Sequence, residues 1–143
     1  MTHSLSRLVV AASLTVVAAP AFAEDILGLW DAGESHVEIY ACGDRLCGRI
    51  AALDEPLDEE GKEKLDKNNP EPALQSRPLL GMDLIAGFVK AGKKKWEDGT
   101  IYDPRDGKTY KCVMKLQRDG SLKVRGYVGP PLLGKTVVWT RIE

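Results

Sequence analysis

Three closely spaced aspartates are the side chains in this sequence that could most readily bind a metal ion. Asp98, Asp103 and Asp106 lie within nine positions, a density that could suggest calcium. Their spacing does not match an EF-hand loop, and no glutamate follows at the last ligand position of such a loop. Aspartates in turns more commonly bond backbone amides. We therefore expect turn carboxylates here and no metal site.

Catalytic groups do not form a complete set. His3 belongs to the leader described below, so His36 is the single histidine of the remaining chain, beside an expected strand start. A Ser-His-Asp arrangement is absent, and Cys112 has no evident base. Acid–base chemistry would need paired carboxylates, and nothing in the acidic segment 54–78 fixes their geometry. We expect a protein that is not an enzyme and that has no cofactor.

Cys42 and Cys47 flank a Gly-Asp turn signal in a stretch that alternates apolar and polar residues. If Asp44 and Arg45 form the loop of a hairpin, Cys42 lies opposite Cys47 and their Cβ atoms come within disulfide range. We expect a structural disulfide, because C-x-x-C spacing is absent and an exported chain meets an oxidising compartment. The alternative is a redox or metal-binding pair.

A second hairpin is expected between residues 109 and 128. A three-residue loop, 118–120, pairs Leu116 with Leu122 and keeps one face apolar, whereas a two-residue loop would mix the faces. Gly120 then supplies the left-handed residue of a bulged turn. In this register Cys112 points inward as a buried free thiol, and Arg125 lies on the opposite face.

Further strands are expected at 26–31, 82–89, 100–102 and 135–142, separated by turn signals that include Asp98-Gly99. With the two hairpins they make seven or eight strands, which predicts an all-β, small antiparallel barrel. The connection from Asp54 to Pro78 is dense in charge. A loop of this length is often functional, but we expect a solvated excursion with one or two exposed helical turns.

Residues 1–23 have the features of a secretory signal peptide. Arg7 precedes an apolar run from Leu8 to Ala19, and Ala21-Phe22-Ala23 fits a cleavage site. The run is short for a membrane span. Cleavage after Ala23 would leave one domain, 24–143, in the periplasm or outside the cell. A formal net charge of −1 gives no electrostatic reason to expect a nucleic acid partner.

Aromatic and cationic residues mark both ends of this domain. Trp30 lies near its start, and Trp139 and Arg141 lie near its end. A guanidinium can stack on an indole while its hydrogens cap nearby carbonyls. We expect these three residues to close the barrel by joining its first and last strands.

Ordered motifs extend across nearly the whole of residues 24–143. They are Gly28-Leu29-Trp30, Cys42-Gly43 with Leu46-Cys47-Gly48-Arg49-Ile50, Asp66 with Asn69-Pro70, Arg77-Pro78-Leu79-Leu80-Gly81, Trp96 with Ile101-Tyr102-Asp103-Pro104, Leu122 to Gly129, and Leu133 to Arg141. This arrangement resembles the domain-of-unknown-function family 2147 of exported bacterial proteins, a resemblance that implies no particular activity or cofactor. The pairing of Gly-x-Trp with a late Arg also resembles lipocalin-type (calycin) barrels, which implies a lipocalin-like fold.

The function that we expect is a periplasmic binding module for a small apolar or amphipathic ligand. Ala41, Gly48 and Gly126 would leave space on the inner face of a barrel that can hold one small molecule. The alternative is an envelope interaction or stability protein whose core is filled by Tyr110, Met114, Leu116 and Leu122. The candidate ligand-binding residues are Arg77, Tyr102, Asp103, Tyr110, Met114 and Arg125.

Four lysines beside Trp96 are a candidate site of membrane contact. Lys90, Lys93, Lys94 and Lys95 would meet anionic lipid headgroups. A solvated hairpin end explains them equally well, because four lysines give only a weak, screened attraction.

Overall fold

Eight antiparallel strands form a closed barrel in the computed structural model, which describes residues 11–15 and 25–143. The predicted signal peptide, 1–23, lies outside the described residues apart from 11–15. Each strand pairs with its neighbours in chain order, and β8 returns to β1. The strands are β1 (Gly28–Asp31), β2 (Ser35–Cys42), β3 (Arg45–Leu53), β4 (Asp83–Gly92), β5 (Lys95–Asp103), β6 (Lys108–Leu116), β7 (Leu122–Tyr127) and β8 (Lys135–Arg141).

Two short 3-10 turns interrupt the connections between strands: η1 (Pro72–Leu74) and η2 (Pro131–Leu133). The all-β barrel predicted from the sequence is therefore confirmed. Within the described residues, no helix has the length and apolar character needed to cross a membrane.

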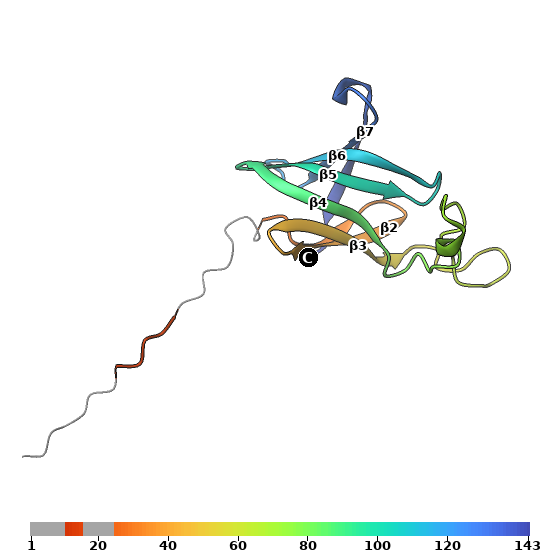
Figure 1. Ribbon diagram of the computed structural model, residues 1–143, viewed down its shortest axis with the longest axis horizontal. Helices are drawn as coiled ribbons and strands as arrows, with labels where there is room; N and C mark the ends of the chain where they lie inside the picture. The colour runs from red at the N-terminus through yellow and green to blue at the C-terminus, as the bar shows by residue number, and fades with distance from the viewer. Residues whose placement is uncertain (1–10, 16–24) are drawn as a thin grey trace, which may run out of the picture.

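The two ends of the barrel differ in their connections. One end, here called the loop end, carries the turns β1–β2, β5–β6 and β7–β8 and the long β3–β4 connection, which extends from the barrel in Figure 1. The other, here called the plugged end, carries the short turns β2–β3, β4–β5 and β6–β7 and both ends of the domain. Ile26 is fully buried there, just before β1.

Alternating apolar residues fill the interior of the barrel. Inward-facing side chains of all the strands make one continuous core, which includes the large rings of Trp30, Trp96, Trp139 and Phe88. The ring of Phe88 lies over Gly99 of the next strand, where an added Cβ would meet a ring carbon at 2.2 Å. A side chain at this position would therefore displace Phe88 from the core.

The Asp98-Gly99 pair lies within β5 instead of forming the predicted turn. Asp98 has φ of 62°, and the β5–β6 register shifts between Trp96 and Gly99. The pair therefore forms a bulge that accommodates Phe88, and the real turn into β5 lies at Lys93 and Lys94. A glycine required by close packing resembles a turn glycine in sequence, and this explains the wrong prediction.

The hairpin β6–β7 has the predicted register. Leu116 pairs with Leu122, Met114 with Val124 and Cys112 with Gly126. Gly120 has φ of 86° in the three-residue loop. Cys112 is a buried free cysteine, and burial raises the pKa of its thiol to about 12.

The predicted disulfide joins Cys42 and Cys47, with their Cα atoms 5.8 Å apart. The predicted register of this hairpin was wrong by two residues: Cys42 pairs with Arg45 and Tyr40 with Cys47, so the disulfide runs diagonally. Gly43, with φ of 67°, allows a tighter turn at Gly43-Asp44. A shift of two residues leaves every side chain on its predicted face.

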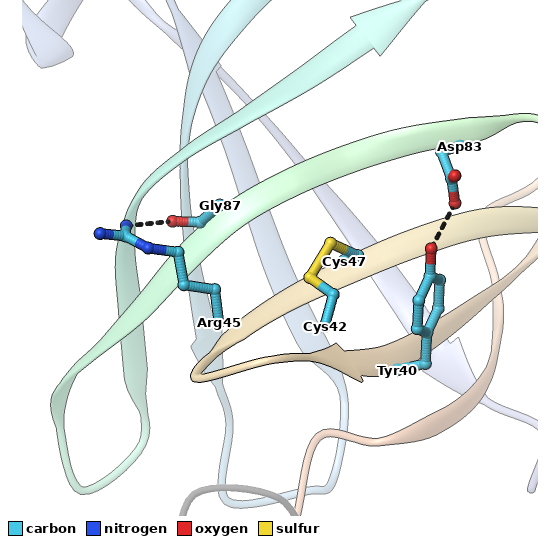
Figure 2. The surroundings of a disulfide bond; sticks show 6 residues. All are labelled: Tyr40, Cys42, Arg45, Cys47, Asp83 and Gly87. Carbon is cyan, nitrogen blue, oxygen red and sulfur yellow. Dashed lines mark hydrogen bonds between the residues drawn. A yellow bond between two sulfur atoms is a disulfide. The ribbon is translucent and has the colours of Figure 1, made fainter.

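Polar contacts on the outer surface hold β2, β3 and β4 together around this disulfide (Figure 2). The Tyr40 hydroxyl donates to the Asp83 carboxylate at 2.6 Å, and the Arg45 guanidinium donates to the Gly87 carbonyl at 3.1 Å. Both bonds connect the β2–β3 hairpin to β4. The hairpin tip is therefore fixed covalently and also docked against its neighbour.

Trp30, Trp139 and Arg141 lie at the closure between β1 and β8. Trp30 pairs with Arg141, whose guanidinium carbon lies 4.3 Å from the centre of an indole ring of Trp30. The same guanidinium donates to the carbonyls of Leu27, at 3.0 Å, and of Asp25. The Trp30 indole N–H donates to the Ile26 carbonyl at 2.9 Å. The segment before β1 is thereby folded across the plugged end.

Replacing Trp30 by Ala should lower the free energy of unfolding by about 3–5 kcal/mol, because it removes a fully buried ring and the surface on which Arg141 stacks. Denaturant titration followed by circular dichroism measures this change. Leu132→Ala, at an exposed position, is the control and should leave the midpoint unchanged. Equal midpoints for the two variants would contradict the closure role of Trp30.

Candidate functional site

The six candidate ligand-binding residues lie in four different environments. Met114 is fully buried in the core, and Arg125 lies on the outer surface of β7. Arg77 and Tyr102 meet at Asp66 of the long β3–β4 connection. The other two, Asp103 and Tyr110, lie beside the β5–β6 turn at the loop end. The six residues therefore do not form one site.

Asp66 is the centre of a polar cluster that the sequence analysis did not single out. Its side chain is fully buried, and it accepts hydrogen bonds from Tyr102 Oη at 2.6 Å, Asn69 Nδ2 at 2.9 Å and Arg77 Nη2 at 2.7 Å. Burial alone would raise the pKa of this carboxyl group, but the three hydrogen bonds outweigh burial and the pKa lies below its ordinary value. Burial and Asp66 together raise the pKa of Tyr102 to about 12.

This cluster anchors the long connection to the barrel. Arg77 comes from the end of the connection and Tyr102 from β5, so Asp66 links two segments that are distant in sequence. The Asn68 side chain donates to the carbonyls of Pro104 and Arg105 in the β5–β6 turn. An added Cβ at Gly107 would lie 1.9 Å from the Asn68 carbonyl oxygen, so the two loops are in close contact.

Most of the long connection is exposed and η1 is its single exposed turn, as its charge density suggested. What the charge density did not indicate is that Asp66 and Asn69 are buried. The motif that places Asp66 three residues before Asn69-Pro70 was the available signal. Charge density alone does not reveal a carboxylate whose donors come from other parts of the chain.

Charged groups gather beside the β5–β6 turn at the loop end of the barrel. Arg105 donates from both Nε and Nη2 to the Asp103 carboxylate, and this contact holds the pKa of Asp103 below its ordinary value, with a further contribution from Lys135. The Tyr110 hydroxyl donates to the Asp106 carboxylate, which raises the pKa of Tyr110. We call these five residues, Asp103, Arg105, Asp106, Tyr110 and Lys135, the charged rim.

The predicted role of the aspartates in turns is confirmed for two of the three. Asp103 Oδ1 accepts from the backbone N–H of Arg105, and Asp106 Oδ1 accepts from that of Lys108. No group of three or more His, Cys, Asp or Glu side chains suited to a metal ion occurs among the described residues.

An apolar inner wall lies next to the charged rim. Gly126 of β7 is close to Ile101 Cγ2 and Tyr110 Cβ, which an added Cβ would meet at 3.6 and 3.5 Å. Val137 of β8 pairs with the buried Val124 and therefore faces the interior, yet 41% of its surface is exposed. We call Ile101, Gly126 and Val137 the inner wall.

Two of the three small residues expected to leave space in the barrel do not do so. Ala41 is exposed near the hairpin tip, and the space beside Gly48 is filled by Ile85, whose Cβ lies 3.2 Å from the position of an added Cβ. Met114, Leu116 and Leu122 fill the interior, as the alternative hypothesis expected, whereas Tyr110 lies at the rim. Surface hollows occur at the plugged end, one beside Lys94 and Leu116 and one beside Leu27 and Glu143.

Comparison with known proteins identifies one family and one solved structure. A family model described as "uncharacterized protein conserved in bacteria (DUF2147)" matches residues 28–141. The solved structure is of protein HP1028 from Helicobacter pylori, described as belonging to the lipocalin family. It is 27% identical, the match covers 82% of this chain and 83% of that one, and the TM-score is 0.71. No curated protein matches the chain.

Replacing Asp66 by Asn should lower the free energy of unfolding by about 3 kcal/mol at neutral pH, because it removes the charge that pairs with Arg77. The lowered pKa of Asp66 means that this stabilisation is present above the pKa of the unfolded carboxyl group, about 3.9, and is lost as pH falls through the folded value. The unfolding midpoint of the unmodified protein should therefore fall more steeply in acid than that of Asp66→Asn.

Denaturant titrations across the acidic range measure both effects. Asp44→Asn, at an exposed position of the β2–β3 turn, is the matched control and should follow the unmodified protein. Tyr102→Phe removes one donor to the carboxylate and should cost about 1.5–3 kcal/mol. If the unfolding midpoint of Asp66→Asn fell in acid as steeply as that of Asp44→Asn, the stabilising role of the Asp66 carboxylate would be contradicted.

Proposed function

This chain belongs to the bacterial family DUF2147, whose model matches residues 28–141, and on that premise we propose that it binds a small amphipathic molecule at the loop end of its lipocalin-like barrel. The apolar part of the ligand contacts the inner wall, and its polar part contacts the charged rim. The role is one of binding without catalysis.

The exposure of Val137 carries this proposal. An inward-facing valine of a barrel strand is normally covered by the opposite wall, but 41% of Val137 is exposed, while Val124, its partner on the same face, is 2% exposed. Apolar surface that faces a barrel interior and meets water is a favourable contact for an apolar ligand. The likeness to a structure of the lipocalin family supports the lipocalin-like fold on which this proposal rests.

The filled core limits which ligands fit. Trp30, Phe88, Trp96 and Met114 occupy the interior toward the plugged end, so a ligand cannot extend far into the barrel. A molecule with a compact apolar part is therefore favoured over one with a long chain. The rim offers cations in Arg105 and Lys135 and a carboxylate in Asp103, and these can orient a polar headgroup of either sign.

The place of action that we propose is the periplasm or the outside of the cell. The signal-peptide features of residues 1–23 support this location, and so does the Cys42–Cys47 disulfide, since such bonds persist in oxidising compartments.

The second candidate is a protein of the cell envelope that binds no ligand. The buried core, which includes Trp30 and Leu122, favours this candidate, because a barrel filled by its own side chains is stable without a ligand. The two candidates differ in whether the protein carries a small molecule when it is purified from its native host.

Replacing Val137 by Glu should weaken binding of the amphipathic fluorophore 1-anilinonaphthalene-8-sulfonate by about tenfold or more. The bound probe would cover the introduced carboxylate and remove it from water, which is unfavourable. Val138→Glu is the matched control: the residue is the next one along β8, is 55% exposed and faces outward. Fluorescence titration measures both affinities. Solvent extraction of the protein from its native host should also yield one small molecule per chain. Equal affinities for the two variants, together with an empty extract, would favour the filled-core candidate.

A further inference from the structure

The three strands β6, β7 and β8 contain no acidic residue. Their sequences, all within the described part of the chain, include basic residues on every strand, although the whole protein has a formal net charge of −1. Cys112, Met114, Leu122 and Val124 face inward and are buried. Strand alternation therefore places Lys111, Lys115, Lys123 and Arg125 together on the outer surface, here called the cationic face.

Lysines on this face lie directly opposite one another. Lys115 of β6 pairs with Lys95 of β5 on one side and with Lys123 of β7 on the other. Side chains at such positions have their Cβ atoms about 5 Å apart, and like charges there destabilise a sheet. Three lysines in one row across three strands therefore cost stability, and a bound anionic surface would relieve their repulsion.

Neighbouring carboxylates neutralise little of this charge. Glu97 forms an ion pair with Lys95 at 3.1 Å, and Asp119 accepts hydrogen bonds from Ser121 while it interacts electrostatically with Lys123. Among the described residues, no ion pair within 4 Å involves Lys111, Lys115 or Lys123. The cationic face is thus complementary to an anionic partner.

An exposed apolar tip adjoins the loop-end edge of the cationic face, next to Arg125. The β7–β8 connection projects away from the barrel (Figure 1) and exposes Leu132 by 87% and Leu133 by 76%. Arg125, on the outer side of β7, donates to the Leu132 carbonyl at 3.2 Å and to Thr136 Oγ1 at 2.8 Å. These bonds hold the tip on the side of the barrel to which the cationic face belongs.

Exposed leucines occur on the same side of the barrel as lysines that form no ion pair among the described residues. This combination distinguishes between a nucleic acid and an anionic membrane as the partner. A polyanion such as a nucleic acid offers phosphates but no apolar phase for two adjacent leucines. The surface of a bilayer with anionic lipids offers both, and peripheral binding strength scales with buried apolar area plus electrostatic attraction. We propose that the protein docks on an anionic phospholipid surface through the cationic face, with Leu132 and Leu133 inserted among the lipids.

This surface differs from the one that the four lysines beside Trp96 suggested. Lys94 forms an ion pair with Asp25 at 3.3 Å, and Lys90 lies over the Trp96 ring at 5.9 Å. Both residues serve contacts within the protein near the plugged end. Lys95 alone of that group belongs to the row that crosses the cationic face.

Vesicle sedimentation tests the electrostatic part of the proposal. The purified protein should bind phosphatidylcholine vesicles that contain about one-third phosphatidylglycerol, and binding should weaken with added salt. Each lysine near such a surface strengthens binding about fivefold, so Lys115→Gln with Lys123→Gln should weaken it about twenty-five-fold. The control, Lys62→Gln with Lys67→Gln, makes the same charge change on the long connection and should bind normally.

The lysine variant also has a readout that does not depend on lipid. Removal of the opposed charges should raise its unfolding midpoint above that of the control, which shows that the variant is folded. Equal vesicle affinities for the two double variants would overturn the proposal, as would equal affinity of the unmodified protein for pure phosphatidylcholine vesicles.

The apolar tip is tested by Leu132→Ser with Leu133→Ser, which should weaken vesicle binding about tenfold or more. Leu57→Ser with Leu80→Ser, at exposed positions of the long connection, is the control and should bind as the unmodified protein does. Full binding by the tip variant would overturn the insertion of the leucines. Binding of a single-stranded oligonucleotide without binding of anionic vesicles would assign the face to a polyanion and overturn the membrane proposal.

Discussion

The contact between the Arg141 guanidinium and the Trp30 indole is the interaction on which the rest of the structure depends. The register that joins β1 to β8 consists of Trp30 with Arg141 and Asp31 with Thr140, and backbone hydrogen bonds of Leu29 to Ile142 and Glu143 complete this short seam. The guanidinium adds hydrogen bonds to Leu27 and Asp25 carbonyls, which fold the preceding segment over the plugged end. The Arg141 side chain thus both closes the sheet and holds the segment that covers the core at the plugged end. Lysine could not replace it, because lysine has no planar fork of donors.

The side chains that stabilise the barrel and the exposed side chains that could contact a ligand lie in different parts of it. The plugged end and the interior are held by buried rings and aliphatic side chains, whereas the loop end presents charge beside uncovered apolar surface. Asp66 extends this separation to the long connection: its buried carboxylate anchors one side of the loop to β5, and the first part of the loop stays in solvent. A buried carboxylate with three donors specifies one position for the loop, which an apolar contact would do less strictly.

The sequence allowed the fold to be predicted because period-two alternation and turn residues are local signals. The β6–β7 register follows from keeping one face apolar, and its bulge glycine is visible in the sequence. Alternation cannot distinguish registers that differ by two residues, which explains the error at Cys42 and Cys47. The Asp98-Gly99 bulge and the Asp66 cluster depend on Phe88 and on Tyr102, which are distant in sequence, so a local pattern such as the motif around Asp66 and Asn69 does not reveal their contacts. Asp103 and Tyr110, two of the six candidate ligand-binding residues, lie at the rim because both are beside the β5–β6 turn.

The seam between the first and last strands has a consequence for the order in which the chain folds. Arg141 and Leu27 are 114 positions apart, so their contact closes a loop of almost the whole domain, whereas the Cys42–Cys47 hairpin closes one of 5 residues. Short-range hairpins form within microseconds, but contacts of high sequence separation carry the largest entropy cost and slow the folding of β proteins. We therefore expect the hairpins to form first and the barrel to close last, after synthesis of its final residues. Until then β1 has an unpaired edge, and this is the stage at which the chain is most exposed to aggregation.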